Sequence, residues 1–404
     1  MMNARRRREI LARGKPEPKN VIWPGEPLLG GWYTEEESET VVRTIRDSMD
    51  WTTGFGFICK EITDFEAAFA KYCGVADAIS INGAGTGLDM AMMCLDLKPS
   101  DEVICPAINF KAAHLAVIGQ GARLVLCEVD PRTFNLDPAD VEKRITRRTR
   151  AIFPVHMNGL SAPIPELIDL ARRHPHPRHG PLKVIGDAAR ACGGVCNGHK
   201  IGSQAWMTVF SFHTQKLMTT LGEGGAITTD DPEVAKRLRA IRQFGGPAGD
   251  TWGTNYKMTK VQAAVGMVQL RRLDEMIARR VKVAQERTAL LKGVPELILP
   301  TEPPGYQHTW YLYTILVPRD WAGAKRDHLI QIMRDEFGVA CIVANPPTYT
   351  HVPFIARHCA GQRLPLSEEL GARLFCLPIH PLMTTEQNEY ICAAVIEVVG
   401  RLRR

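Results

Sequence analysis

The sequence predicts an α/β protein with a mostly parallel central sheet, helices on both faces of that sheet, and a small C-terminal α+β domain. Short and almost wholly apolar segments recur along residues 76–212, and amphipathic segments with helical spacing fall between them. Strands of this kind are buried on both faces, which is typical of a parallel sheet covered by helices. From about Leu297 the pattern changes to a less regular mixture, which indicates a second, smaller unit.

The predicted elements of the first part alternate between helix and strand. An amphipathic helix over 34–49 starts at an acidic, capped end, and a helix over 62–74 stops at Gly74. Strands are expected in ADAISIN, DEVICP, ARLVLCEVD, RAIFPVH, LKVIGDAA and TVFSF. Further helices are expected in GLDMAMMCLDL, NFKAAHLAVIGQ, DPADVEKRIT, IPELIDLARRH and DPEVAKRLRAIRQFG.

A long helix over 259–293 is expected to link the two parts of the chain. Beyond it we expect strands in HTWYLYTILV, VACIVAN and LFCLPI, and helices in DHLIQIMRDEFG and TEQNEYICAAVIEVVGRLRR. The sequence therefore divides into an N-terminal extension (1–34), a large domain (35–270), and the linking helix with a small C-terminal domain (271–404).

Composition and charge argue against several classes of protein. The chain is 45% hydrophobic and 23% charged, and no apolar run approaches the roughly 20 residues of a membrane span. The net charge of +6 comes partly from the run Arg5 to Arg8, which we interpret as a solvated, mobile terminus. Elsewhere both signs are mixed, without the basic face interleaved with aromatic residues that nucleic-acid binding needs. We therefore expect neither a nucleic-acid nor a membrane partner.

The cysteines favour a reducing compartment. There are 11 of them, scattered through apolar segments, and the N-terminus lacks the apolar core and cleavage site of a secretory signal. Cys192 and Cys196 are close in sequence, but no Cys/His set elsewhere completes a zinc spacing. We expect a cytoplasmic protein without a bound metal.

A lone lysine follows the apolar run TVFSF and precedes a glycine-rich turn. This residue is Lys216, in the stretch FSFHTQKLMTTLGEGGAITTD. Ligands of open α/β sheets bind beyond the carboxyl ends of the strands, so a reactive amine belongs there. Partial desolvation lowers the pKa of a lysine and frees its amine to form a Schiff base. The turn from Gly222 to Gly225 is expected to reverse the chain into the next strand.

Four further features accompany the lysine. Asp187 ends the strand of LKVIGDAA, where a carboxylate can pair with the ring nitrogen of pyridoxal phosphate. The turn NGAGTG lies between a strand and a helix, whose free N–H groups suit a phosphate. Ser211 could bind the same phosphate, and Phe110 could stack on a flat ring. Taken singly, the turn, Asp187 and Phe110 are each about as compatible with a structural role.

Taken in order, these segments resemble the sugar aminotransferases of the DegT/StrS family. The resemblance runs from about Glu35 to the C-terminus. It is carried by CPAINFKAAHLAVIGQGARLVLCEVDPRTFNLDP, FPVHMNG, VIGDAARACGG, SFHTQKLMTTLGEGGAITTDD, GTNYKMTKVQAAVGMVQLRRLDE and LPIHPLMTTEQNEYI. It implies the aspartate aminotransferase fold (fold type I), pyridoxal 5'-phosphate as cofactor, and amino transfer as the reaction.

The resemblance also implies roles for particular residues. Lys216 would bond the cofactor and then act as acid and base, while Asp187 would hold the ring nitrogen. The phosphate would be bound by Gly85, Thr86 and Ser211, and the ring would stack on Phe110. Asn255 would reach the phosphate from the neighbouring subunit, which implies a homodimer with shared active sites.

Some positions depart from the family pattern. Arg190 stands where the family commonly has Gln or His near the ring hydroxyl, and Tyr311 stands near a common histidine. The phosphate turn AGTGL is shifted by one residue against the usual G-T. Loose candidates for contacts with a hydroxyl-rich substrate are His308, Tyr311, His156, Asn158 and His351, each more often structural.

The predicted function is transfer of an amino group from glutamate or glutamine to a nucleotide-linked keto-sugar or a keto-cyclitol, in antibiotic biosynthesis of the aminoglycoside type. The alternatives are a pyridoxal-phosphate-dependent sugar dehydratase and a regulatory protein that binds the cofactor without turnover. Dehydratase relatives have lost the lysine that this chain keeps, which favours amino transfer.

Overall fold

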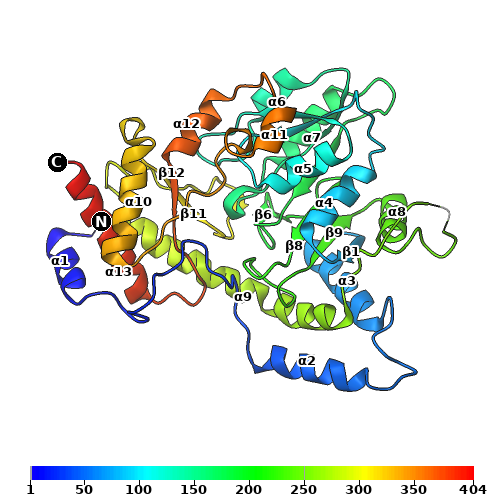
Figure 1. The fold of residues 1–404 in the computed structure, drawn as a ribbon, viewed down its shortest axis with the longest axis horizontal. Helices are drawn as coiled ribbons and strands as arrows, with labels where there is room; N and C mark the ends of the chain where they lie inside the picture. The colour runs from blue at the N-terminus through cyan, green and yellow to red at the C-terminus, as the bar shows by residue number, and fades with distance from the viewer. Residues whose placement is uncertain (1, 250) are drawn as a thin grey trace.

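A seven-stranded sheet forms the centre of the larger part of the molecule (Figure 1). The computed structural model describes residues 2–249 and 251–404. In order across the sheet, the strands are β1 (Asp77–Ile81), β9 (Gly225–Thr229), β8 (Met207–Ser211), β5 (Lys183–Asp187), β4 (Thr149–Ile152), β2 (Glu102–Pro106) and β3 (Arg123–Cys127). β9 runs antiparallel to β1 and β8, and the other neighbouring strands are parallel. The predicted mostly parallel sheet is confirmed.

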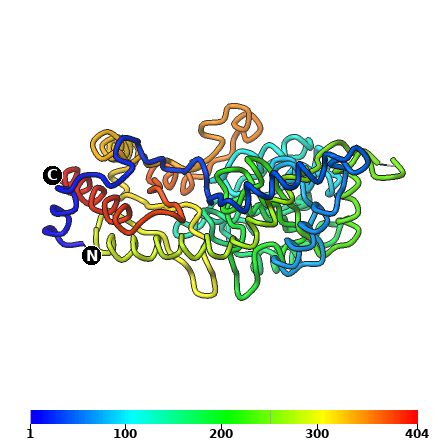
Figure 2. Tube along the Cα trace, turned by 90° about the horizontal axis from the view of Figure 1, so that it is seen from below, coloured from blue at the N-terminus to red at the C-terminus, as the bar shows by residue number. Residues whose placement is uncertain are grey.

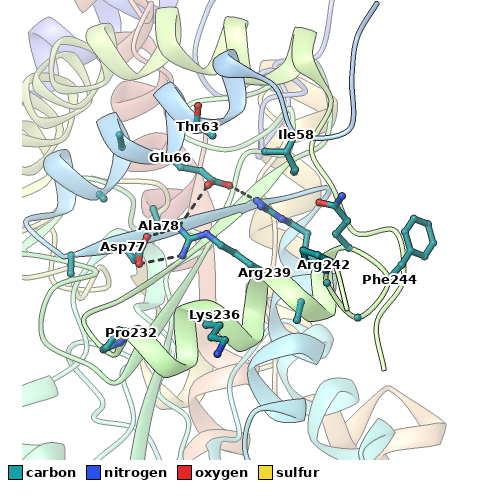
Figure 3. Close-up of a pocket in the computed structure, with 18 of the residues that line it drawn as sticks. Ile58, Thr63, Glu66, Asp77, Ala78, Pro232, Lys236, Arg239, Arg242 and Phe244 are labelled. Carbon is teal, nitrogen blue, oxygen red and sulfur yellow. Dashed lines mark hydrogen bonds and ion pairs between the residues drawn. The ribbon is translucent and has the colours of Figure 1, made fainter. Parts of the chain in front are cut away.

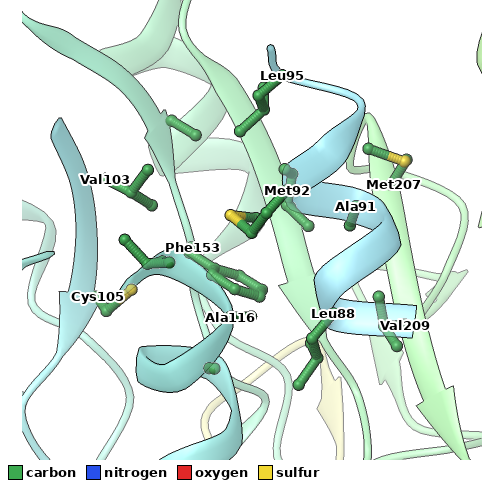
Figure 4. Packing of buried hydrophobic residues seen from close by; sticks show 14 of the residues in the cluster. Leu88, Ala91, Met92, Leu95, Val103, Cys105, Ala116, Phe153, Met207 and Val209 are labelled. Carbon is green, nitrogen blue, oxygen red and sulfur yellow. The ribbon is translucent and has the colours of Figure 1, made fainter. Parts of the chain in front are cut away.

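Helices cover both faces of this sheet. They are α3 (Lys60–Cys73), α4 (Ala84–Met93), α5 (Lys111–Gly119), α6 (Pro138–Arg144), α7 (Ile164–Arg173), α8 (Pro232–Arg242) and α9 (Lys260–Leu291), and α2 (Glu35–Asp47) packs on α9. On one face, Leu88 and Met92 of α4 pack in a cluster with Phe153 and Val209 (Figure 4). On the other face, the rings of α3 and the residue after β8 pack edge to face, with Phe65 and Phe212 centroids 5.6 Å apart.

The glycine-rich turn after Lys216 reverses the chain as predicted. The Phe212 N–H donates to the Gly224 carbonyl at 2.8 Å, and β9 then returns antiparallel to β8. Because β9 alone is reversed, β1, β8, β5 and β2 all end at the same edge of the sheet. The residues that follow these ends are therefore brought together although they are far apart in the sequence.

The C-terminal part contains a two-stranded antiparallel sheet of β11 (Tyr313–Leu316) and β12 (Leu374–Leu377). Its helices are α10 (Ala324–Phe337), α11 (Pro353–His358), α12 (Pro365–Arg373) and α13 (Thr385–Leu402). A small sheet of β10 (Tyr306–Gln307), β6 (Val195–Cys196) and β7 (His199–Lys200) and the short 3-10 helices at Met157–Gly159, Arg319–Trp321 and Thr348–Thr350 complete the elements.

The predicted strand VACIVAN is wrong. Residues 339–345 make only isolated bridges among the described residues, from Val339 to Trp23 and from Ile342 to Cys376. The extended course of the segment ends at Asn345, whose backbone is left-handed with φ of 53°. It bends instead along the wall of the cavity described below.

The basic N-terminal run lies in a docked helix rather than in a free tail. Helix α1 (Ala4–Ala12) packs on α13, with Arg6 paired to Glu389 and Arg7 Nε 3.3 Å from Glu397. The chain then runs from this end of the molecule, where both termini lie, along one side toward the middle (Figure 2). We call residues 23–31 the N-terminal strap.

The cysteines and the apolar segments lie in the structure as follows from their composition. The eleven cysteines are all free and ten of them are buried, as expected of small apolar side chains. Among the residues that the structure describes, no helix has both the length and the apolar character needed to cross a bilayer.

Candidate active site

A cavity of about 690 Å³ opens at the edge where the parallel strands end. Seven of the predicted site residues line it, namely Lys216, Asp187, Ser211, Gly85, Thr86, Phe110 and Arg190. They come from four separate segments of the sequence, at the ends of β1, β2, β5 and β8. The topology of the sheet therefore assembles the predicted site, because each segment follows the carboxyl end of a strand.

Lys216 lies in the loop between β8 and β9. Its backbone N–H donates to the His213 carbonyl at 2.8 Å, so a tight turn directs the side chain into the cavity. Its Nζ lies 3.0 Å from the hydroxyl of Tyr311. Burial and, to a smaller extent, the Arg190 cation together lower the pKa of Lys216 to about 8, against the raising effect of nearby carboxylates. About a tenth of this amine is therefore unprotonated at pH 7, far more than for an ordinary lysine.

Asp187 is the last residue of β5 and is buried. Its carboxylate accepts the Ala189 N–H at 3.0 Å. Burial raises the pKa of Asp187, while that N–H, Arg190 and Lys216 lower it. Gly186 is required beside it, because a Cβ there would lie 2.7 Å from His156 Nε2. The carboxylate is thus held at a fixed place with room for a donor in the cavity.

The turn between β1 and α4 forms a cradle for an anion. The first-turn N–H groups of α4, from Ala84 to Thr86, have no intrahelical partner and lie at the positive end of the helix dipole. Gly85 has nothing within 4 Å of a built Cβ, which leaves open space beside it. Ser211 lines the same cavity and its Oγ accepts the His213 N–H at 3.3 Å. This arrangement suits a phosphate group.

Two neighbouring residues after β2 present a ring and an amide to the cavity. Phe110 caps α5 and is 52% exposed, so one face of its ring is free to stack. Asn109 is buried, and neither its Oδ1 nor its Nδ2 has a hydrogen-bond partner among the described residues. An unpaired buried amide is costly unless a ligand satisfies it. Asn109 therefore also indicates a bound polar group here.

Arg190 is a buried cation at the same site. Its guanidinium lies 5.7 Å from the centre of the Tyr311 ring, and Nη1 lies 4.0 Å from Met157 Sδ. Within the described residues, no carboxylate lies within 4.0 Å of it. A buried guanidinium with no ion pair has capacity for an anionic group of a ligand.

Two predicted residues lie elsewhere. His308 is buried outside the cavity, stacked on Trp310 with ring centres 4.1 Å apart and accepting the Trp310 N–H at 2.8 Å. Asn255 lines a separate surface hollow with Phe55 and Phe57. In a single chain neither residue reaches Lys216.

Of the looser candidates, His156 is buried below the sheet edge and burial lowers its pKa to about 3. Asn158 is also buried, and His351 bonds the Pro347 carbonyl. None of the three lines the cavity among the described residues.

Sequence reasoning missed Glu26 and Asn109. Glu26 belongs to the N-terminal strap, lines the cavity and accepts the hydroxyl proton of Tyr311. Nothing in the sequence links residues 285 positions apart. Asn109 adjoins Phe110 in CPAINF, so a buried polar residue inside an apolar run was a usable signal.

The site fits pyridoxal 5'-phosphate. The helix end and Ser211 suit its phosphate, Asp187 suits its ring nitrogen, Phe110 suits its ring, and the amine of Lys216 suits its aldehyde. Such a ligand would satisfy the buried Asn109 amide, which has no hydrogen-bond partner among the described residues, and the buried Arg190 cation, which has no ion pair there.

A larger cavity, of about 1120 Å³, lies between α3 and α8 (Figure 3). Four of its five charged side chains pair with each other, and Lys236 is the exception among the described residues. Arg242 pairs with Glu66, and Arg239 bonds Asp77 at 3.2 Å and lies 4.0 Å from Glu66. Among the described residues that line it, no amine lies beside a buried, unpaired carboxylate, so we assign the chemistry to the smaller cavity.

Comparison with known proteins supports this assignment. The model of the DegT/DnrJ/EryC1/StrS aminotransferase family matches residues 33–396. The chain is 36% identical to the GDP-perosamine synthase of Caulobacter vibrioides, over 88% of this chain and 94% of that one. It is 34% identical to the dTDP-3-amino-3,4,6-trideoxy-alpha-D-glucose transaminase of Streptomyces venezuelae, over 91% and 93%.

A solved structure is similar over the same extent. The crystal structure of DesV from S. venezuelae, in complex with a ketimine intermediate, superposes with a TM-score of 0.82 at 33% identity, covering 90% of this chain and 94% of that one. The chain therefore belongs to the DegT/DnrJ/EryC1/StrS family, and it is a pyridoxal-phosphate-dependent aminotransferase with the fold of these enzymes.

Proposed function

We propose that this aminotransferase moves an amino group from glutamate or glutamine to the ketone of a nucleotide-linked sugar, with keto-cyclitols as the second class of acceptor. The observation that carries the proposal is that a half-buried amine of low pKa and a buried carboxylate line one cavity. One of the two similar enzymes is named after a GDP-linked sugar and the other after a dTDP-linked sugar. These names support a nucleotide-linked sugar as the acceptor. The antibiotic pathway that we propose for the product rests on family resemblance alone.

In this proposal each residue has a defined task. Bound pyridoxal phosphate supplies an electron sink for the negative charge that develops at the donor's α-carbon. Lys216 would hold the cofactor through its aldehyde carbon and, once released, would take the proton from the donor's α-carbon and deliver it to that former aldehyde carbon. Asp187 holds the ring nitrogen in its protonated form.

The remaining residues orient the cofactor. Gly85, Thr86 and Ser211 bind the phosphate, Phe110 stacks on the ring, and Arg190 faces the ring hydroxyl. Fixed orientation matters because proton transfer requires the amine to be placed within hydrogen-bonding distance of the α-carbon.

We further propose a homodimer whose partner completes this site through Asn255. Large apolar side chains are exposed on the two loops beside Asn255, including Trp51 at 93%, Phe57 at 70%, Trp252 at 62% and Phe244 at 56%. Such a patch is typical of a protein interface. Lys257 Nζ, buried between the Phe57 and Phe244 rings without a hydrogen-bond partner in the described residues, would gain a partner across it.

The dimer can be tested by complementation. Lys216→Ala and Asn255→Ala subunits, each of which we expect to be inactive alone, are mixed after brief unfolding. If Asn255 acts in the partner's site, hybrids contain one intact site and regain about a quarter of the activity per subunit, since half the dimers are hybrids with one working site of two. Absence of recovery, with hybrid dimers verified by native mass spectrometry, would contradict the shared site.

The reaction is tested by spectroscopy and then by substrate screening. We expect the purified protein to absorb visible light through its bound cofactor, and glutamate or glutamine to bleach that band. The aminated form is then offered keto-sugars linked to GDP or dTDP and keto-cyclitols, with recovery of the band as the readout. A band that no amino donor changes would favour the regulatory or dehydratase function.

A further inference from the structure

The N-terminal strap is fixed against three parts of the molecule. The Trp23 N–H donates to the Gly338 carbonyl at 2.9 Å, beside α10, and the Gly30 N–H donates to the Thr214 carbonyl of the lysine loop at 2.9 Å. Arg280 of α9 donates to the Gly30 carbonyl at 2.6 Å. Gly30 packs so closely that a Cβ would lie 2.2 Å from the Lys216 carbonyl oxygen. The strap is thus a fixed wall of the site.

One strap side chain reaches the reactive lysine through a tyrosine. Lys216 Nζ donates to the Tyr311 hydroxyl at 3.0 Å, and that hydroxyl donates to a carboxylate oxygen of Glu26. Burial and the Glu26 carboxylate both raise the pKa of Tyr311, so the phenol keeps its proton. The three groups therefore form a chain of hydrogen bonds with one direction, from lysine to tyrosine to glutamate.

The direction of these hydrogen bonds leaves the lone pair of the Lys216 amine free. A phenol has a single proton, and Glu26 accepts it, so the Tyr311 oxygen can only accept from Lys216. A neutral amine that donates one N–H to Tyr311 keeps its lone pair for the cavity. Without Glu26 the phenol could turn and donate its proton to that lone pair, which would block it.

We propose that Glu26 and Tyr311 are positioning residues for Lys216: Glu26 fixes the direction of the Tyr311 O–H bond, and Tyr311 holds the released amine with its lone pair facing the substrate. This inference rests on the proposed role of Lys216 in the reaction. It also gives the strap a function, although Glu26 precedes residue 33, where the family match begins.

The charges around Lys216 make the proposal testable by pH. The groups that act on its amine are Arg190, Glu26, Asp187 and Glu223, with Tyr311 in contact. Glu26 is the carboxylate with the largest raising effect on the Lys216 pKa, and Arg190 is the cation that lowers it. Loss of the Glu26 charge should therefore lower the pKa of Lys216.

The first experiment uses cofactor-free full-length protein. Reductive methylation of Lys216 is followed across pH by peptide mass spectrometry, which reports the free-amine fraction without any turnover. We expect a midpoint near 8 in the wild type and a lower midpoint in Glu26→Gln. Glu17→Gln, the same change at an exposed position of the N-terminal segment, is the matched control and should leave the midpoint unchanged.

The second experiment follows the half-reaction of the loaded enzyme with ordinary and α-deuterated donor. Glu26→Ala and Tyr311→Phe should slow it roughly tenfold to hundredfold, raise the isotope effect and leave the donor KM nearly unchanged. Tyr313→Phe is the control, since its hydroxyl lies 2.7 Å from Thr288 and has no contact with Lys216. Because Glu26 acts through Tyr311, the double variant should be no slower than the slower single variant.

The outcomes separate this inference from the proposed function. Borohydride reduction of the loaded protein, followed by peptide mapping, shows which residue bonds the cofactor. A tag on another residue would overturn the role of Lys216 itself. A tag on Lys216 together with an unchanged midpoint in Glu26→Gln, or with effects of Glu26→Ala and Tyr311→Phe that multiply in the double variant, would overturn only the positioning role.

Discussion

Two cavities of this protein contain buried charges and differ in how those charges are satisfied. Between α3 and α8, in the larger cavity, Glu66 bonds Arg242 and also accepts the Ser80 N–H at 2.9 Å (Figure 3). At the strand ends, in the smaller cavity, Lys216 and Asp187 have no ion-pair partner within 4.0 Å among the described residues. Charges that satisfy each other stabilise the fold, whereas charges left unpaired are available to a ligand.

Breaking the Glu66–Arg242 pair of the larger cavity should have the largest effect, and it should change only the free energy of unfolding. Glu66→Gln leaves the buried Arg242 without its countercharge, and loss of one partner of a buried pair costs about 3–5 kcal/mol. Urea unfolding followed by circular dichroism measures this loss. The folded fraction should still bind the cofactor at Lys216, and a loss of that bond in folded protein would show that the two cavities are not separate in function.

Replacing an aspartate by asparagine should slow the donor half-reaction in the smaller cavity and leave its rate unchanged in the larger one. Asp187→Asn removes the countercharge of the ring nitrogen and should slow the donor half-reaction about 10²–10³-fold, the usual cost of one electrostatic group at a reacting centre. Asp77→Asn only weakens a half-exposed pair with Arg239 and should leave the rate unchanged. Stopped-flow absorbance of both variants is the measurement. Equal rates in the two variants would contradict the assignment of Asp187.

The smallest expected effect is a shift in the pH midpoint of Lys216 methylation. Arg190→Gln removes the cation that lowers the Lys216 pKa, so that pKa should rise from about 8 toward the ordinary value of 10.5. A higher pKa leaves less free amine at a given pH, about tenfold less at neutral pH for each unit. The pH midpoint of Lys216 methylation should therefore move upward, opposite to the shift expected for Glu26→Gln. A downward shift would mean that Arg190 does not act on Lys216 by its charge.

The sequence was sufficient to predict the sheet and seven of the residues that line the cavity, because the signals for them are local. Strand ends can be recognised from short apolar runs, and in a parallel sheet the strand ends share an edge, so Lys216, Asp187 and Ser211 could be placed together without a contact map. The turn after β1 was recognised in the same way.

The features that the sequence did not predict correctly depend on tertiary contacts rather than on local patterns. Glu26 reaches Tyr311 only through the tertiary path of the strap, and no periodicity encodes that path. The segment VACIVAN has the composition of a strand, but its neighbours provide single bridges rather than a ladder. His308 has the polarity of a site residue, yet stacking on Trp310 and a bond to its backbone satisfy it in the interior. Local patterns cannot show such partners.

The central claim is that the unpaired amine at the strand ends carries the chemistry. The most direct measurement is borohydride reduction of the purified protein with peptide mapping, in the wild type, Lys216→Ala and Lys236→Ala, the last being a lysine that lines the larger cavity. We predict a reduced cofactor adduct on Lys216 in the wild type and in Lys236→Ala, and none in Lys216→Ala, whose transamination falls at least about 10²–10⁴-fold. An adduct on any other lysine, or full activity of Lys216→Ala, would contradict the claim.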